Sequence, residues 1–166
     1  MNEAPSERAG LLSHPWGWIG TGFGSGLAPR APGTVGSLGA LPLHFLLCSL
    51  SIPVHALGAL GITGAGIWAA QRYASERSET DPQRVVIDEV AGTVLALGCV
   101  RGEHWRYALA AFLLFRLFDI WKPGPIRLLE HARPVGLGIM LDDVLAGLLA
   151  GVLARGLAEI VPALLS

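Results

Sequence analysis

Long apolar runs separated by short polar clusters dominate the chain. No Asp, Glu, Lys or Arg occurs from Ala31 through Gln71, a gap of 41 residues. Pro53 divides this gap into a shorter run over 36–51 and a longer run over 54–70. With flanking residues included, each run is close to the roughly 17–25 residues with which a helix crosses a bilayer. The pattern predicts a helical hairpin through a membrane.

Three further apolar runs, over 90–100, 107–115 and 144–153, follow the most hydrophilic segment, which is predicted as a polar loop over 72–84. Each run alone is too short to span a bilayer, and reaches that length only if charged residues at one end enter the membrane margin. Neither strand alternation of useful length nor an internal repeat is evident. We therefore predict an all-α fold, a compact multi-helix integral membrane bundle of about five helices with short or interfacial spans.

The composition favours a membrane as the solvent of this chain. Hydrophobic residues make up 52% of the 166 residues and charged residues 15%, against roughly 25% charged in typical soluble domains. Mean hydropathy is +0.52. The length suits one domain. We expect a flexible tail and interfacial segment over 1–19, whose two Trp suit an interface and a core equally well, and one helical domain over 20–166.

Several function classes lack their signals. A net charge of −1 provides no bulk attraction to nucleic acid. Cys48 and Cys99 lie in apolar runs, with no CxxC and, on this reading, no histidine at ligand spacing, so buried thiols are favoured over a disulfide or a metal site. Neither cysteine is followed six positions later by Arg, as a cysteine phosphatase loop requires, and no GxSxG is present.

Threading the five predicted helices up and down a bilayer tests the membrane hypothesis. With 20–37 on side one, all five acids attached to apolar helices fall on side one as well. The same side receives nine of the 12 Lys and Arg: Arg8, Arg30, Arg72, Arg77, Arg84, Arg116, Lys122, Arg127 and Arg133. The positive-inside rule makes side one cytoplasmic. A carboxylate cluster at the inner membrane surface is the expected result.

Those acids form two adjacent pairs, Asp88–Glu89 and Asp142–Asp143, each predicted to start a helix, and Asp119 near the end of a third. Capping explains one acid at a helix start, because a carboxylate accepts free N–H groups there and suits the positive end of the dipole. Capping does not explain doubled pairs or Asp119. Carboxylates that converge at low dielectric hold protons unless a cation joins them. Oxygen ligands alone suit a hard ion, Mg²⁺ above all.

Basic residues accompany the acids. Arg116, Asp119 and Lys122 recur at three-residue spacing in FRLFDIWKPGPIR. An exposed ladder of ion pairs would have the same spacing, but the preceding ALAAFLLF is apolar. Two cations beside a divalent metal ion are unfavourable unless an anion lies between them. A phosphate supplies that charge, and Arg can hold two of its oxygens.

Two glycine-containing segments complete the candidate site. In GTGFGSGLAPRAPGTVGS (20–37), alternate glycines allow close backbone approach to a ligand, and PGTVGS enters a helix whose free N–H groups bind anions. Close helix packing in a membrane explains these small residues equally well. HARPVGLGIM (131–140) is expected as a loop leading into Asp142. His131 there is a candidate base or phosphate contact or simply a solvated residue, and the other histidines, His44 and His55 included, have no supporting context.

Three motifs together resemble the phosphatidylglycerophosphatase A family: GFGSGLAPRAPGTVGS, VIDEVAG, and FRLFDIWKPGPI with GLGIMLDDVLAG. They occur in the family's order over about 20–151. The resemblance implies an integral membrane enzyme of phospholipid biosynthesis in the bacterial cytoplasmic (inner) membrane. Such a phosphoric monoester hydrolase uses Mg²⁺ to convert phosphatidylglycerophosphate to phosphatidylglycerol and inorganic phosphate.

The family's motifs transfer to particular residues. Its acids, expected as metal ligands and catalytic groups, fall on Asp88, Glu89, Asp119, Asp142 and Asp143. Phosphate contacts are expected from Arg116, Lys122, Thr34, Ser37 and Arg30, although Arg30 falls where family members vary. One carboxylate would activate water, while a covalent aspartyl-phosphate route stays open.

Two other functions fit the same sequence. A small helical membrane protein could bind or conduct a divalent cation through intramembrane acids, but a cation pathway should avoid the Arg and Lys of side one. A phosphatase of the same fold could act on another phosphomonoester. Homo-oligomer formation is left open by the sequence.

Overall fold

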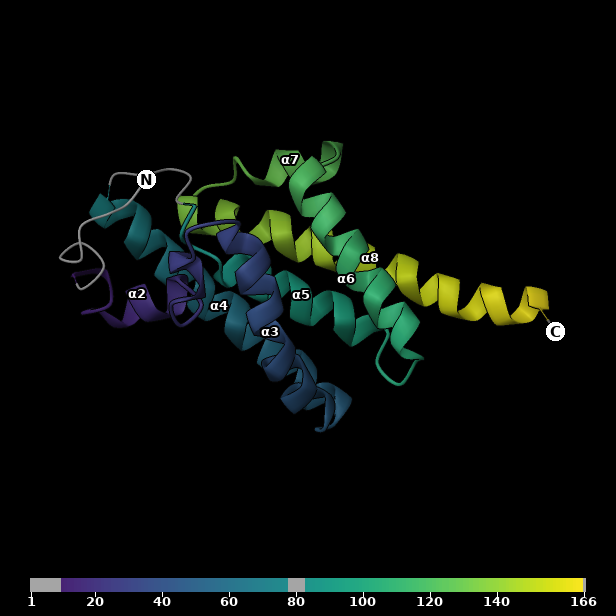
Figure 1. Ribbon diagram of the computed structural model, residues 1–166. Helices are drawn as coiled ribbons and strands as arrows, with labels where there is room; N and C mark the ends of the chain where they lie inside the picture. Colours follow the sequence, from purple (N-terminus) through teal and green to yellow (C-terminus); the bar gives the residue numbers. More distant parts are fainter. Residues whose placement is uncertain (1–9, 78–82, 166) are drawn as a thin grey trace.

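The computed structural model describes residues 10–77 and 83–165 and is a bundle of helices (Figure 1). No strand occurs within these residues, so the predicted all-α fold is confirmed. The bounds are α2 Pro15–Gly20, a 3₁₀ turn η1 Ser25–Leu27, α3 Pro32–Cys48, α4 Ile52–Arg77, α5 Ile87–Cys99, α6 Trp105–Trp121, α7 Gly124–Leu129 and α8 Val135–Leu165. The five long helices, α3, α4, α5, α6 and α8, contain the five predicted apolar runs.

Two predicted boundaries are wrong. α4 continues to Arg77, so the first part of the polar segment 72–84 is helical, because Gln, Arg and Glu favour a helix even where the apolar run has ended. α8 begins at Val135, directly after Pro134, so most of the predicted loop 131–140 is helical. Residues 1–9 of the predicted tail and 78–82 of the polar segment lie outside the described residues.

Asp142 and Asp143 accordingly lie two turns inside α8 and not at its start. Capping of a helix start cannot account for these two acids, because the backbone N–H groups at that depth are already bonded within the helix. By contrast, Asp88 and Glu89 occupy the first turn of α5, as predicted.

The described part of the predicted N-terminal tail packs against α4. Leu11 is fully buried in the core. The ring of Trp16 lies edge-on to that of Tyr73 in α4, with centroids 5.9 Å apart. Trp18 is 44% exposed. Of the two Trp, one therefore packs against the core and the other lies at the surface, the two environments that the sequence left open.

The closest helix contact joins α5 to α8 through glycines. A Cβ added to Gly147 would lie 2.3 Å from the carbonyl oxygen of Gly92, and a Cβ on Gly92 would lie 2.7 Å from that of Asp143. Small residues allow helix backbones to approach this closely, as in membrane helix pairs. The contact holds the acidic turn of α8 against the beginning of α5.

The outer surface of the bundle carries many large apolar side chains. Phe45 in α3, Leu60 in α4, and Leu113 and Ile120 in α6 each expose more than half of their surface. Two helices, Ile52–Arg77 and Val135–Val161, are long and apolar enough to cross a membrane. Only 22% of the apolar window in the first is buried, unlike the core helix of a soluble protein. An exposed apolar surface of this kind is favourable in an apolar solvent and unfavourable in water.

Three segments meet at the end of the bundle that lies away from the predicted acidic cluster. The Arg101 guanidinium, after α5, donates to the Leu50 carbonyl oxygen in the turn after α3. Arg155 in α8 pairs with Glu103 at 2.8 Å. This grouping agrees with the predicted threading, which placed the turn after the first helix, the loop after the third helix and Arg155 on side two.

Candidate active site

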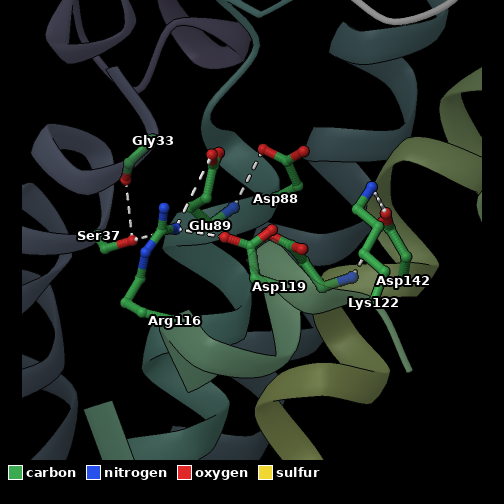
Figure 2. A network of polar contacts seen from close by, with 9 residues as sticks. Gly33, Ser37, Asp88, Glu89, Arg116, Asp119, Lys122 and Asp142 are labelled. Atoms are coloured by element: carbon green, nitrogen blue, oxygen red, sulfur yellow. Dashed lines mark hydrogen bonds and ion pairs between the residues drawn. The ribbon is translucent and has the colours of Figure 1, made fainter. Parts of the chain in front are cut away.

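A polar cavity of about 440 Å³ opens where α3, α5, α6 and α8 meet. Its lining contains all five predicted acids and both principal basic residues: Asp88, Glu89, Asp119, Asp142, Asp143, Arg116 and Lys122. The first turn of α3, with Gly33 and Thr34, provides another part of the wall. Figure 2 shows how side chains from these separate helices converge. Groups that the sequence placed only on a common side therefore share a single cavity.

Asp88, Glu89 and Asp143 form the core of the acidic cluster. One carboxylate oxygen from each lies within 4.8 Å of the others. Oε2 of Glu89 and Oδ2 of Asp143 are buried without a hydrogen-bond partner. A buried polar atom without a partner costs on the order of 1–3 kcal/mol, and more when it is charged. These free oxygens, in a set without nitrogen or sulfur, fit a hard cation such as Mg²⁺.

The electrostatics of the α5 acids point the same way. Burial raises the pKa of Asp88 well above its usual value, and the negative charge of Glu89 raises it further. Burial also raises the pKa of Glu89, although the hydrogen bond with Asp88 and the charge of Arg116 oppose this shift. Both carboxyls thus retain protons more readily than in water, and a divalent cation would take the place of those protons.

The other two acids are held by basic residues. Nη1 of Arg116 lies 2.6 Å from Oδ2 of Asp119, and Nζ of Lys122 lies 2.7 Å from Oδ2 of Asp142 (Figure 2). Lys122 also pairs with Glu130 at 3.3 Å. Of the five acids predicted as metal ligands, three therefore combine into a group with free oxygens and two neutralise cations.

Lys122 reaches Asp142 from an unusual backbone conformation. It ends α6 with φ 46°, in the left-handed region, and Pro123 follows it. A non-glycine residue there costs on the order of 1–3 kcal/mol, and such strain gathers at functional sites. Ala31, which also lines the cavity, has φ 46° as well. Burial alone would lower the pKa of Lys122, but the hydrogen bond and charge of Asp142 raise it, so the ammonium group stays charged.

Ser37 lies behind Arg116 and not in the cavity. Its buried Oγ accepts a hydrogen bond from Nη1 of Arg116 at 3.0 Å and donates to the Gly33 carbonyl at 2.9 Å. Ser37 thus orients the guanidinium, whose Nε is buried without a partner. Among the predicted phosphate contacts on and before α3, Thr34 lines the cavity, while Arg30 is exposed and is not part of the lining.

The glycines of 20–37 have two different roles. Gly33 allows the α3 backbone to approach the acids, because a Cβ there would lie 2.1 Å from Oε1 of Glu89 and 3.3 Å from Nη2 of Arg116. Gly26 faces backbone, since its Cβ would lie 2.1 Å from the Arg84 carbonyl oxygen. Close packing therefore accounts for Gly26, and approach to the site accounts for Gly33.

A second polar cavity, of about 250 Å³, adjoins the first and shares Asp88, Lys122 and Asp142 with it. Its further lining includes Glu130, His131 and Arg133. Of these three residues, only His131 was a candidate from the sequence; Glu130 and Arg133 were not predicted as site residues. Their position in the short polar linker between α6 and α8 was the available signal, because both ends of that linker carry site residues.

Comparison with known proteins finds relatives along most of the chain. The family model described as Phosphatidylglycerophosphatase A matches residues 18–158. Phosphatidylglycerophosphatase A of Escherichia coli (strain K12) is 36% identical over 143 residues, which cover 86% of this chain and 83% of that protein. The protein of the same name from Haemophilus influenzae (Rd) is 37% identical over 147 residues, 88% of this chain and 90% of its own.

A third relative carries a different name. The protein from Bacteroides thetaiotaomicron, named as a candidate phosphatidylinositol-3-phosphatase, is 48% identical over 143 residues, 81% of this chain and 88% of its own. The comparison with solved structures returns no significant match.

Proposed function

Since this chain belongs to the phosphatidylglycerophosphatase A family, whose named members are phosphoric monoester hydrolases, we propose that it removes the terminal phosphate of phosphatidylglycerophosphate. The products would be phosphatidylglycerol and inorganic phosphate. One observation supports this function at the described cavity above all others: carboxylates with free oxygens and two basic side chains line the same cavity. A pathway for cations alone would not place Arg116 and Lys122 among those acids.

Mg²⁺ is part of the proposal. Asp88, Glu89 and Asp143 would hold it, because their oxygens lie within 4.8 Å of one another and two of the side chains have an unpartnered buried oxygen. When bound, the ion would draw negative charge from the phosphoryl group and offset the charge of the three carboxylates. Asp119 and Asp142 would shape the site through the basic residues that they hold.

Arg116 and Lys122 would bind the phosphoryl oxygens. Each already neutralises one carboxylate, so a phosphate entering the cavity would share these donors with Asp119 and Asp142. Ser37 keeps the Arg116 guanidinium oriented before the substrate arrives. Donors arranged in advance stabilise the charge that develops on the phosphoryl oxygens during transfer.

The attacking water needs a proton acceptor. Asp119 and Asp142 line the cavity outside the three-carboxylate group, so either would be positioned to accept this proton once the phosphoryl group takes over its basic partner. The water oxygen would bond to phosphorus while the bond from phosphorus to the glycerol oxygen breaks, and the proton taken from water would then pass to that glycerol oxygen. We write the reaction as direct attack by water, with either carboxylate as the base.

We place the site at the cytoplasmic face of a bacterial cytoplasmic membrane. A phosphomonoester lipid has its head group at the interface and its chains in the bilayer. Ile120 lines the cavity and is 75% exposed, and the neighbouring Trp121 is 70% exposed. These apolar side chains beside a polar cavity would contact the lipid chains while the head group enters, as amphipathic aromatics do at interfaces.

Phosphate release from defined lipids tests this function. The purified chain in detergent micelles is supplied with phosphatidylglycerophosphate, phosphatidylinositol 3-phosphate or soluble glycerol 3-phosphate, each with Mg²⁺ and with a chelator. We expect Mg²⁺-dependent release, fastest from phosphatidylglycerophosphate. Faster release from phosphatidylinositol 3-phosphate would mean that this chain prefers the substrate in the name of the Bacteroides relative. Unchanged release in the presence of chelator would refute the metal site.

A matched pair of variants locates the activity. Glu89→Gln should lower kcat at least about 100-fold, because it removes a charged oxygen ligand at the reacting group. Glu103→Gln makes the same change at the opposite end, where the carboxylate pairs with Arg155, and should keep normal turnover. Equal activity of the two variants would show that the described cavity is not the active site.

A further inference from the structure

A second group of metal-binding side chains lies at the end of the bundle opposite the cavity. His44 and Cys48 stand in the last turns of α3, and His55 in the first turn of α4. The prediction that no histidine lies at ligand spacing from Cys48 was wrong. His44 precedes Cys48 by four residues and so shares its helix face. The short turn over 49–51 then brings His55 to the same place.

The distances are close to those of a zinc site. Sγ of Cys48 lies 3.3 Å from Nε2 of His44 and 3.9 Å from Nδ1 of His55. A tetrahedral Zn²⁺ with usual bond lengths separates its sulfur and nitrogen ligands by about 3.6 Å and two bound imidazole centroids by about 5 Å. The two imidazole centroids here are 5.9 Å apart. Rotation of the two rings toward each other would complete three ligands.

The surroundings of His55 favour a ligand orientation. Both histidines are only 7% exposed. Nε2 of His55 lies 3.4 Å from the Val94 carbonyl oxygen, and Gly98 leaves room for the ring, since a Cβ there would lie 2.6 Å from Nε2. When Nε2–H donates to this carbonyl, the Nδ1 lone pair is free on the side of Cys48. A carbonyl on the far nitrogen commonly orients a metal-binding histidine.

Arg101 restricts which ions can bind. Its guanidinium donates to the Leu50 carbonyl oxygen, two residues beyond Cys48, and its charge acts on both His44 and Cys48. A positive charge beside the cluster repels any cation. Ions that bond strongly to sulfur overcome this repulsion, and hard ions do not. The arrangement therefore selects Zn²⁺ over Mg²⁺.

We propose that His44, Cys48 and His55 form a Zn²⁺ site that joins the end of α3 to the start of α4. The exposed turn over 49–51 gives the ion access from water, and a water molecule would complete the four ligands, as in open zinc sites. α3 carries Gly33 and Ser37 at its other end, so the ion would brace the helix that orients Arg116.

Cobalt substitution tests the site on the full chain. The protein, purified in detergent, is reduced, stripped with chelator and titrated with Co²⁺ in excess Mg²⁺, which fills the carboxylate site. We expect about one Co²⁺ per chain with a near-ultraviolet sulfur-to-cobalt band and visible bands of four-coordinate cobalt, both removed by Zn²⁺. No cysteine lines the phosphatase cavity among the described residues, so the sulfur band cannot arise there.

Three variants complete the test. Cys48→Ser should abolish the sulfur band, while Cys99→Ser, the same change at the other free thiol, should keep it. His55→Ala retains both thiols and should weaken Co²⁺ binding at least about tenfold. Thermal unfolding of each variant in detergent reports its folding. Absence of the band in the unmodified chain, its persistence in Cys48→Ser, its loss in Cys99→Ser or unchanged binding by His55→Ala would overturn the proposal.

Discussion

Glu89 is constrained from two helices at once. Oε1 faces the α3 backbone at Gly33 and lies 4.0 Å from Nη1 of Arg116, while Oε2 is buried without a partner. Its position therefore depends on the absence of a side chain at residue 33, and this dependence can be measured.

Gly33→Ala should impair catalysis more than stability. The new Cβ would lie 2.1 Å from Oε1 of Glu89, so the carboxylate must move out of the acidic cluster. We expect kcat/KM to fall at least about tenfold, since misplacement of a reacting group by 1 Å can cost two orders of magnitude. Gly39→Ala, on the same helix with its nearest atom at 3.9 Å, is the control and should act normally. Equal kcat/KM for the two variants would contradict the assignment of Gly33.

Asp88→Asn should abolish turnover while stabilising the metal-free protein above acidic pH. Asp88 has a raised pKa, so the folded protein binds this proton more tightly than the unfolded chain does. The tighter binding of this proton therefore stabilises the folded state fully below the usual pKa of 3.8, and this stabilisation is lost as pH rises through the raised pKa of the folded protein. The variant has no proton to lose at residue 88, so its stability should not fall over this pH range. Thermal unfolding in chelator should give the variant a midpoint higher by about 2–4 °C or more at pH 8.

The two proteins should unfold at nearly the same temperature at pH 4, and Mg²⁺ should raise the midpoint of the unmodified protein at pH 8. A midpoint of the unmodified protein that rises with pH relative to Asp88→Asn would contradict the predicted sign.

Lys122→Met should destabilise the fold. It leaves Asp142, which is 4% exposed, without its cation. Loss of one partner from a buried pair costs on the order of 3 kcal/mol. Arg155→Met removes the shared partner of Glu103 and Glu159, two ion pairs at the surface, and surface ion pairs contribute little, so its unfolding midpoint should change little. Similar midpoints for both variants, measured by thermal unfolding in detergent, would show that the pair with Asp142 contributes no more than a surface ion pair.

At the scale of elements, the glycine contact between α5 and α8 positions the acidic cluster. Asp143 and Gly147 are four residues apart and so share one face of α8, and Gly92 lies one turn beyond Asp88 on α5. Where the two helices touch at Gly92 and Gly147, the acids one turn away must also be close. The distance between the helix axes thus sets the size of the proposed metal site.

Gly147→Ala should separate these helices. The added Cβ would lie 2.3 Å from the Gly92 carbonyl oxygen, and overpacking of this kind costs about 1–3 kcal/mol. We expect a lower unfolding midpoint and weaker Mg²⁺ activation. Gly156→Ala on the same helix meets no atom within 4 Å and should raise stability slightly, by about 0.5–1 kcal/mol. An equal response in both variants would contradict the proposed role of the α5–α8 contact.

The sequence predicted which segments are helical, but it did not predict every position at which a helix begins or ends. The start of α5 was predicted correctly, because the acids Asp88 and Glu89 directly precede a continuous apolar run. The start of α8 was not, because Asp142 and Asp143 interrupt a helix that begins at Val135. Buried acids inside an apolar helix look like a helix boundary in the sequence, since hydropathy does not distinguish a cavity wall from the end of a run.

At the scale of the whole molecule, the proposed orientation predicts which residues are reachable from outside the cell. Starting from a variant with Cys48→Ser and Cys99→Ser, one exposed residue at each end is replaced by cysteine: Glu76→Cys near the acidic end or His104→Cys at the opposite end. A membrane-impermeant maleimide should label His104→Cys in intact cells and Glu76→Cys only after permeabilisation. The reverse pattern would invert the proposed topology, while the cavity and its chemistry would be unaffected.

The sequence by itself determined the all-α class, the apolar exterior, the family and the gathering of acids and bases on one side. These properties follow from composition, the spacing of apolar runs and contiguous motifs, all of which are local along the chain. Within that frame, Asp88, Glu89, Asp119, Asp142 and Asp143 were equivalent candidates for a metal ion.

Only the tertiary structure separated those five acids into a cluster of three, two of which have an unpartnered buried oxygen, and two held by Arg116 and Lys122 at 2.6–2.7 Å. It also placed Ser37 behind Arg116 and brought His55 to His44 and Cys48. These outcomes depend on the rotation of each helix about its axis and on how closely the helices pack. Small residues such as Gly92 and Gly147 set that packing across long sequence separations, and hydropathy along a single chain does not contain it.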